Sequence, residues 1–165
     1  MGQMEVDTFT ALLRRHAGLI YKVAHAYCRN AADRDDVIQE IAIQLWRVRD
    51  RYDPRFRETT WIYRIAINVA ISAYRRTRRH EAVPLDEPMF TVDPVEPPQE
   101  IARLLEHVRA LPPLERALVL LYLDDHDHAA IAAVLGISVS NVGTKLQRIK
   151  ARLRAAMEGG TDGAR

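Results

Sequence analysis

A stripe of aromatic, amide and basic side chains between positions 61 and 75 has the chemistry to bind single-stranded DNA. Its members are three or four residues apart, the spacing that places side chains on one face of a helix. Aromatic rings stack on unpaired bases, an amide reads a base edge, and guanidinium groups hold the phosphate backbone. The stripe consists of Trp61, Arg64, Asn68, Ser72 and Arg75.

Further arginines extend this stripe at both ends. Arg76 follows it, and Arg55 and Arg57 lie in the preceding 52–59 loop, where Pro54 interrupts the helical pattern. An unpaired base that has left the stack can be held in such a loop. Because clustered arginines alone are a weak signal, the prediction of single-strand binding depends on Trp61 and Asn68.

A second group of polar side chains, near the C-terminus, has the chemistry to read duplex DNA. From Val139 to Met157 a narrow apolar stripe alternates with an opposite face of short polar residues and arginines. Such groups read base edges in the major groove, and flanking lysines and arginines suit phosphates. The face carries Ser140, Thr144, Gln147, Arg148 and Arg154, flanked by Lys145, Lys150 and Arg152. An ordinary solvated amphipathic helix is the alternative.

The segment before this helix has a helix-turn-helix pattern, which favours the DNA-reading interpretation. Asp127 can cap a short helix, and Ala132 is small enough for a close helix crossing. Gly136 tolerates a left-handed turn, and Ser138 can cap the next helix.

An acidic face on the second predicted helix, from about Asp33 to Arg51, has the character of a protein-binding surface. It consists of Asp35, Asp36, Gln39 and Glu40, opposite the buried stripe of Val37, Ile38, Ile41, Leu45 and Val48. Ile43 and Trp46 lie among the acids and can serve as apolar anchors. Alternatively, these two side chains pack on the first or third helix. Acid–base chemistry by the carboxylates is disfavoured, because nothing places them beside a nucleophile or metal.

The sequence contains no pattern that predicts an enzyme. Asp124, Asp125, His126, Asp127 and His128 resemble metal ligands in composition, but the histidines lack a paired helical spacing with other ligands. P-loop, zincin, kinase and nucleophile-elbow motifs are absent. We therefore expect no catalytic residue, metal, cofactor or small-molecule substrate.

Composition and charge are consistent with a nucleic-acid partner. Residues 1–80 carry 15 Lys/Arg against 9 Asp/Glu, whereas residues 81–110 carry 2 against 7. Such an asymmetry of charge along the chain indicates a polyanionic binding partner for the basic part. No apolar run approaches the ~20 residues of a membrane span, the N-terminus lacks a signal pattern, and Cys28 is a lone, buried thiol. A cytoplasmic location is expected.

The apolar spacing is helical almost throughout, which predicts an all-α chain of two small domains. The first domain, 1–80, holds helices from about Thr8 to Cys28, 33–51 and 60–78. Asp7 or Thr8 caps the first of these, and His16 is a satisfied core histidine on its apolar face. An acidic linker, 81–99, holds five of the eight prolines. The second domain, 100–158, holds a helix from Pro112–Pro113 to about Asp124, then 128–135 and 139–157. A disordered tail, 159–165, follows.

These motifs together resemble the extracytoplasmic-function (ECF, group IV) sigma factors of bacterial RNA polymerase over nearly the whole chain. The resemblance is carried by four segments in the family's order and spacing: 32–40 (ADRDDVIQE), 60–68 (TWIYRIAIN), 111–116 (LPPLER) and 131–138 (IAAVLGIS). It identifies residues 1–80 with sigma region 2 and residues 100–158 with sigma region 4. The resemblance implies these two domains alone, without the extra domains of primary sigma factors.

The resemblance implies a role for each surface. The acidic face, with Ile43 and Trp46, would bind the coiled-coil of the polymerase largest subunit, and the flap would be a further contact. Minus-ten DNA would be melted and captured by Arg55, Arg57, Trp61, Arg64, Asn68, Ser72, Arg75 and Arg76. Minus-thirty-five DNA would be read by Ser140, Asn141, Thr144, Lys145, Gln147, Arg148 and Lys150.

The resemblance also implies a monomer when free and an anti-sigma factor as regulator. Gly143 stands where relatives carry a basic residue, and Ala129 and Ala130 replace common acids, so the minus-thirty-five sequence is left open. Two rival interpretations are a dimeric helix-turn-helix regulator of palindromic sites and a decoy that binds polymerase without recognising promoters. The basic stripe argues against the decoy.

Overall fold

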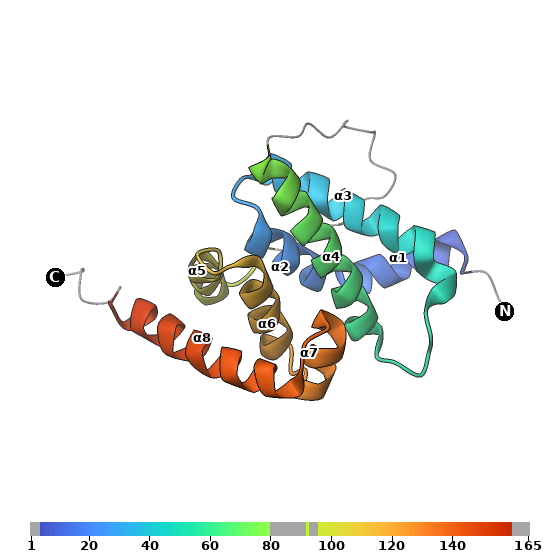
Figure 1. The fold of residues 1–165 in the computed structure, drawn as a ribbon. Helices are drawn as coiled ribbons and strands as arrows, with labels where there is room; N and C mark the ends of the chain where they lie inside the picture. The colour runs from blue at the N-terminus through green and yellow to red at the C-terminus, as the bar shows by residue number, and fades with distance from the viewer. Residues whose placement is uncertain (1–3, 80–91, 93–95, 160–165) are drawn as a thin grey trace. The chain divides into compact units, whose positions relative to one another are not determined.

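The computed structural model describes residues 4–79, 92 and 96–159, and every regular element in these ranges is helical (Figure 1). The chain divides into two compact units, Met1–Glu96 and Pro97–Arg165. The predicted all-α architecture of two small helical domains is confirmed. The predicted linker and C-terminal tail lie outside the described residues, apart from Val92, residues 96–99 and Gly159.

Four α-helices and a 3₁₀ turn form the N-terminal unit: α1 (Val6–Arg15), α2 (Ala17–Tyr27), α3 (Ala31–Val48), η1 (Arg49–Arg51) and α4 (Glu58–Arg78). Helices α2, α3 and α4 pack on one another, and α1 packs on α2. The predicted first helix is broken at His16, whose backbone leaves the helical region at φ −111° and ψ 16°. This bend separates α1 from α2.

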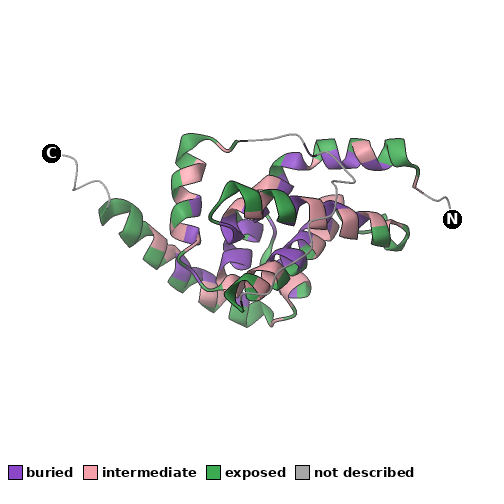
Figure 2. Cartoon of the chain, turned by 90° about the horizontal axis from the view of Figure 1, so that it is seen from above, coloured by how far each residue is buried: buried purple, intermediate pink, exposed green. Residues whose placement is uncertain are grey.

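The predicted apolar faces form the core of the N-terminal unit. The apolar spacing of the first helix predicts that six residues face inward, and all six are buried: Phe9, Leu12, Leu13, Ile20, Val23 and Tyr27. Cys28 is buried as well. From α3 the core receives Val37, Ile38, Ile41, Ala42 and Leu45, and from α4 it receives Ile62, Tyr63, Ala66, Ile67, Val69 and Ala70. The prediction that Val48 is buried is wrong, because this last residue of α3 is only half-buried. The buried residues lie on the inner faces of α3 and α4, and exposed residues lie on their outer faces. Figure 2 shows this separation of buried and exposed residues along the helices. The outer faces are therefore available for binding.

Two helix starts in this unit differ from the prediction. The prediction that Asp7 or Thr8 caps the first helix is wrong, because the backbone amide of Phe9 already donates to the carbonyl of Glu5 at 3.0 Å. The helical ladder therefore begins before Asp7. The start of α3 is earlier than expected, because the side chain of Asn30 accepts a hydrogen bond from the Asp33 amide at 2.8 Å.

The C-terminal unit consists of α5 (Gln99–Val108), α6 (Pro113–Leu123), α7 (His128–Leu135) and α8 (Val139–Gly159). Helix α8 packs on the other three helices, and α6 packs on α7. Arg116 is buried, and its Nε donates to the carbonyl of Leu111 at 2.6 Å. This bond closes the turn between α5 and α6 and explains the arginine of the 111–116 motif.

The predicted helix-turn-helix is confirmed in its local details. The carboxylate of Asp127 accepts a hydrogen bond from the amide of Ala130 at 2.7 Å. Gly136 has φ +68°, the left-handed conformation that glycine adopts without a side-chain penalty. The hydroxyl of Ser138 accepts from the amide of Asn141 at 3.1 Å. These two hydrogen bonds and the left-handed turn at Gly136 set the angle at which α8 leaves the turn.

Two boundary predictions require correction. The predicted linker includes Gln99, but in the structure Gln99 is the first residue of α5. A helix can start directly after Pro98. Gly159 was assigned to the tail but ends α8, as glycine is well tolerated at a helix C-terminus. Among the described residues no single helix is both long and apolar enough to cross a membrane. Only α7 and α8 taken together meet that test, and they are bent by 104°.

Candidate nucleic-acid and protein-binding surfaces

The predicted single-strand stripe lies on the outer face of α4. Arg64, Asn68, Ser72 and Arg75 are exposed. Trp61 is half-buried, and its ring lies 5.0 Å from that of Tyr52, tilted by 43°. The stripe therefore offers amide, hydroxyl and guanidinium groups along the helix and an aromatic pair at its N-terminal end.

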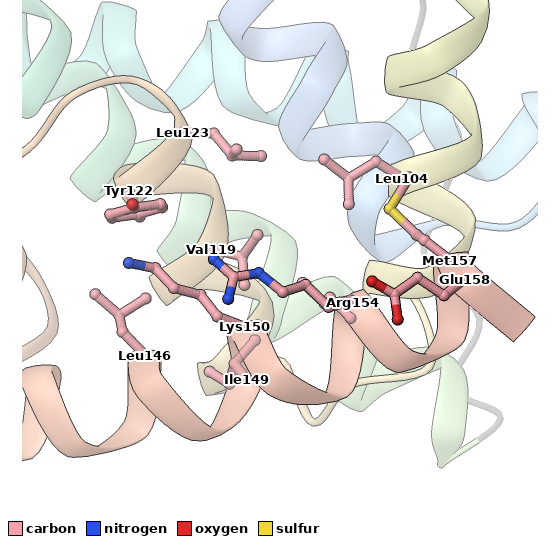
Figure 3. A pocket seen from close by; sticks show the side chains of 11 residues that line it. Leu104, Val119, Tyr122, Leu123, Leu146, Ile149, Lys150, Arg154, Met157 and Glu158 are labelled. Atoms are coloured by element: carbon pink, nitrogen blue, oxygen red, sulfur yellow. The ribbon is translucent and has the colours of Figure 1, made fainter.

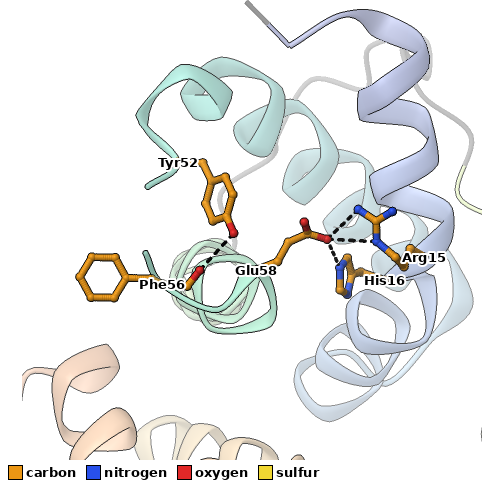
Figure 4. A network of polar contacts seen from close by, with 5 residues as sticks. All are labelled: Arg15, His16, Tyr52, Phe56 and Glu58. Carbon is orange, nitrogen blue, oxygen red and sulfur yellow. Dashed lines mark hydrogen bonds and ion pairs between the residues drawn. The ribbon is translucent and has the colours of Figure 1, made fainter. Parts of the chain in front are cut away.

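The loop of residues 52–57 adds an aromatic side chain that sequence reasoning missed. Phe56 is 64% exposed, which is unusual for a phenylalanine. The hydroxyl of Tyr52 donates to the carbonyl of Phe56 at 3.1 Å (Figure 4). The signal that could have found it is an aromatic residue between two arginines in a segment broken by proline.

The predicted loop arginines, Arg55 and Arg57, are both exposed. The guanidinium of Arg55 donates to the carboxylate of Asp53 at 2.7 Å, and its amide donates to the same carboxylate at 3.0 Å. These hydrogen bonds lower the pKa of Asp53. The loop is thus internally bonded while its arginine side chains stay at the surface.

Directly after the loop, the carboxylate of Glu58 bonds to the side chains of Arg15 and His16, which lie at the junction of α1 and α2. Its Oε1 accepts from Arg15 at 2.8 Å and lies 2.5 Å from Nε2 of His16 (Figure 4). Partial burial alone would raise the pKa of Glu58, but the hydrogen bonds from Arg15 and His16 and their charge lower it. His16 is mostly buried and hydrogen-bonded, which agrees with the prediction of a satisfied histidine.

The acidic face is only partly solvent-exposed. Asp35 and Asp36 are exposed, whereas Gln39 and Glu40 are half-buried. Partial desolvation and the charges of Asp33 and Asp35 raise the pKa of Asp36. Concentrated negative charge of this kind is relieved by a basic partner.

One residue predicted to bind DNA contacts the acidic face instead. The guanidinium of Arg76 donates to the carboxylate of Glu40 at 2.7 Å, and both side chains are half-buried. This ion pair joins α3 to α4. It connects the predicted protein-binding face with the end of the predicted DNA stripe.

The two predicted apolar anchors are half-buried. The ring of Trp46 packs edge-on against Phe9 of α1 with a centroid distance of 5.1 Å, and the guanidinium of Arg49 lies 3.7 Å above it. For Trp46, packing on the first helix is thus what the structure shows. Ile43 keeps part of its surface exposed beside the acids.

The predicted duplex-reading face of α8 lies opposite its buried residues, Val142, Leu146 and Ile149. The exposed members, named here the reading face, are Ser140, Asn141, Thr144, Gln147 and Arg148. Lys145 is half-buried. Lys150 differs from the others because its ammonium lies 4.0 Å from the ring centre of Tyr122 on α6, a cation–π contact.

Lys150 lines an apolar groove between α5, α6 and α8 (Figure 3). The groove has a volume of about 260 Å³, and its lining includes Leu104, Val119 and Leu146. Tyr122, Leu123 and Met157 at its edge are each exposed by more than a third. Exposed apolar surface gathered in one groove is typical of a protein-binding site.

The described residues hold no group of three His, Cys, Asp or Glu that could bind a metal ion. His126 is buried, and its Nδ1 lies 3.2 Å from the carbonyl of Leu121. This contact lies within the turn after α6. It gives His126, one of the two histidines in the 124–128 segment, a structural role.

Two family models match the chain. Residues 12–80 match "Sigma-70 region 2", and residues 99–153 match "Sigma-70, region 4". The first match covers the bundle with the acidic face and the stripe. The second covers the four helices of the C-terminal unit as far as Leu153.

Similar curated proteins are sigma factors. CarQ of Myxococcus xanthus is 30% identical over 153 residues, which cover 90% of this chain and 88% of CarQ. SigE of Mycolicibacterium smegmatis is 29% identical over 161 residues, 92% of this chain. The chain spans only 62% of the length of SigE.

Solved structures of sigma factors share the fold. The structure of CnrH in complex with the cytosolic domain of CnrY has 25% identity, a TM-score of 0.67, and coverage of 94% of this chain and 90% of that one. RpoE of Bartonella quintana, in complex with the anti-sigma factor NepR, has the same TM-score at 14% identity.

Proposed function

The chain belongs to the extracytoplasmic-function sigma factors of RNA polymerase, and from this premise we propose that it binds core polymerase and directs it to a specific set of promoters. The observation that carries the proposal is the presence of two separate helical units with different exposed chemistry. One presents aromatic and amide groups suited to unpaired bases, and the other presents a helix-turn-helix suited to duplex DNA.

The acidic face of α3 is the proposed contact for the coiled-coil of the polymerase largest subunit. Asp35 and Asp36 are exposed, and partial desolvation together with the charges of Asp33 and Asp35 raises the pKa of Asp36. A basic surface would stabilise this negative charge. Gln39, Glu40 and Ile43 offer partly exposed surface beside them. Trp46 acts mainly as packing for α1, so its role in binding is to hold α3 in place.

The outer face of α4 and the 52–57 loop are the proposed minus-ten surface. Phe56 and Trp61 supply rings for stacking, Asn68 and Ser72 supply polar contacts to bases, and Arg64 and Arg75 supply phosphate contacts. Arg55 and Arg57 extend the charge along the loop. Arg76 is assigned to the ion pair with Glu40 and only secondarily to DNA.

The reading face of α8 is the proposed minus-thirty-five surface. Ser140, Asn141, Thr144, Gln147 and Arg148 would meet base edges and the adjacent backbone in the major groove. Lys145 suits a phosphate. Lys150, held over Tyr122, is a weaker candidate for DNA than its charge alone suggests.

The apolar groove of the C-terminal unit is the proposed contact for the polymerase flap. Its partly exposed Tyr122, Leu123 and Met157 offer apolar surface to a protein partner, and Lys150, Arg154 and Glu158 add charged groups to its lining. Holoenzyme carrying Leu123→Glu should lose transcription that depends on the minus-thirty-five element, and unchanged transcription would refute this contact.

The proposed mechanism transfers specificity to the polymerase without catalysis by this chain. Each unit alone offers a small DNA-binding area, since single modules bury ~600–1,000 Å². The polymerase would hold both units on one promoter and perform the chemistry in the cytoplasm. We also propose an anti-sigma protein as regulator, because CnrH was solved with the cytosolic domain of CnrY.

Run-off transcription tests this function. Core polymerase with this chain, given a library of promoters, should produce defined transcripts that are absent with core polymerase alone. A dimeric helix-turn-helix regulator would instead retard palindromic duplex sites without polymerase. Failure to support any transcript would refute the proposal.

A further inference from the structure

Beyond the residues that would contact DNA, the N-terminal unit contains a cluster at the entry to α4. We infer that Glu58, held by Arg15 and His16, is a positioning residue that fixes the 52–57 loop in the form that captures an unpaired base. This inference rests on the proposed minus-ten function of the loop.

The cluster joins segments that are far apart in the sequence. Nε and a terminal nitrogen of Arg15 donate to Oε1 of Glu58 at 3.1 Å and 2.8 Å, and His16 reaches the same oxygen. These residues are 42 and 43 positions apart from Glu58. The bend at His16 between α1 and α2 leaves its imidazole only 12% exposed, facing Glu58 (Figure 4).

The position of Glu58 makes it an anchor for the loop. Glu58 is the first residue of α4 and follows the loop directly. At the other end of the loop, Tyr52 packs on Trp61 and donates to the carbonyl of Phe56. The loop is therefore fixed at both ends, with the exposed Phe56 between them.

Fixing the loop lowers the entropic cost of stacking a base on Phe56. A loop that must become ordered on binding loses affinity by the free energy of that ordering. The acid at the start of α4 also favours the helix, because a negative charge stabilises a helix N-terminus.

The pairing also solves an electrostatic problem. A lone carboxylate beside a DNA-binding loop would repel phosphates, whereas Arg15 and His16 surround the Glu58 charge. Glu58 is thus suited to a structural contact within the protein rather than to a contact with DNA.

The test compares holoenzymes made with Phe56→Ala, Glu58→Ala and the double variant. The probe is the promoter that gives the strongest run-off transcript, prepared with a preformed bubble over its minus-ten element. Phe56→Ala should weaken binding about 10-fold, within the range for loss of one base stack. Glu58→Ala should weaken it about 5-fold through the loop, and the double variant should match Phe56→Ala within about 2-fold, because both changes disable the same contact.

Glu115→Ala is the matched control, because it removes a similar ion pair, with Arg152 at 2.8 Å, from the other unit. It should leave unchanged the binding to a bubble fragment that carries the minus-ten element without the minus-thirty-five element, which excludes any effect of the released Arg152 on duplex DNA. If Glu58→Ala does not fold, Arg15→Met replaces it, since Arg15 is largely exposed and contributes two of the three contacts. That variant should weaken binding about 2- to 3-fold, again without adding to the effect of Phe56→Ala.

Two results would overturn the inference alone. One is a normal loss with Phe56→Ala but none with either Glu58→Ala or Arg15→Met. The other is a double variant whose loss equals the product of the single losses. If Phe56→Ala itself has no effect, the proposed function of the loop fails, and the inference fails with it.

Discussion

The two units hold their proposed DNA-binding side chains in different settings. On α8 the reading face lies opposite the buried stripe, and the contacts that orient the helix are local, from Asp127, Gly136 and Ser138. In the N-terminal unit, two charged side chains in or beside the proposed sites are bonded to residues far away in the sequence. Arg76 pairs with Glu40 across 36 positions, and Glu58 pairs with Arg15 across 43.

This difference determines whether a substitution changes DNA or protein binding alone or also changes the packing of its unit. The reading face of α8 can be altered with little effect on the core, because its side chains are exposed. In the N-terminal unit, a substitution at Glu40 or Arg76 removes a proposed binding group and an interhelical contact together. Variants at these two positions need a compensating exchange before a loss of binding can be assigned to the binding surface, whereas exposed residues such as Asn68 can be tested directly.

The largest expected effect comes from reversing charge on the acidic face. Asp36→Arg with Glu40→Arg should weaken binding to core polymerase by roughly 100-fold or more, because like charges placed opposite each other cost several kcal/mol. Fluorescence titration of labelled protein with core polymerase measures this loss.

The exchange Glu40→Arg with Arg76→Glu separates the two roles of Glu40. It rebuilds the ion pair between α3 and α4, so the melting temperature should remain close to that of the original protein, while polymerase binding stays weak. An exchange variant that regained full polymerase affinity would show that Glu40 serves only the ion pair.

Smaller losses, of DNA affinity, should show which form of DNA each unit binds. In the holoenzyme, Asn68→Ala should weaken binding to a single-stranded minus-ten strand by roughly 10-fold and leave a duplex minus-thirty-five fragment unaffected. Gln147→Ala should do the reverse by a similar factor. Competition assays with the two DNA forms measure both, and equal losses on both forms would contradict the division of labour.

Two glycines of the helix-turn-helix should respond in opposite directions. A Cβ at Gly143 would meet the imidazole of His128 at 3.7 Å, an ordinary contact, so Gly143→Ala should raise the free energy of unfolding by about 0.5–1 kcal/mol. Gly136 has φ +68°, so Gly136→Ala should lower it by about 1 kcal/mol. Urea denaturation measures both, and changes of the same sign would refute the backbone assignment.

The smallest expected effect is a pH dependence in the N-terminal unit. The pKa of Glu58 is lowered on folding, so its stabilising contribution is complete at neutral pH and is lost as the pH falls through and below its ordinary value of 4.5. Glu58→Gln should therefore lower stability at pH 7 by less than about 1 kcal/mol, and this difference should shrink progressively as the pH falls below 4.5.

Asp36 provides a control of opposite sign. Its pKa is raised on folding, so its ionised form opposes folding at neutral pH. Asp36→Asn should slightly increase stability at pH 7, and this difference should also disappear in acid. Thermal melts across pH would contradict the account if both variants shifted stability in the same direction.

Local signals made much of the fold predictable from the sequence. Asp127, Gly136 and Ser138 act within three or four residues, so the local sequence alone predicts their roles. Apolar periodicity located the buried faces of α3, α4 and α8. The family segments were recognisable because they include such local features, for example Arg116, which bonds to Leu111.

Contacts between distant residues were beyond sequence reasoning. Nothing in the sequence near Arg76 indicates Glu40, so this arginine was predicted to bind DNA. The helical wheel of α3 places Trp46 among the acids and leaves open whether its ring is an anchor or packs on the first or third helix, and only the structure shows the contact with Phe9. The exposure of Phe56 depends on the fold of its loop, which the helical periodicity could not predict.

Promoter affinity with and without core polymerase tests the central claim most directly. A filter-binding assay would use the promoter selected by run-off transcription, at one fixed salt concentration because phosphate contacts are salt-dependent. We expect the free chain to bind this promoter weakly and the holoenzyme to bind it at least about 100-fold more tightly, since two small units gain affinity when they are held together. Equal affinity for the free chain and the holoenzyme would contradict the account.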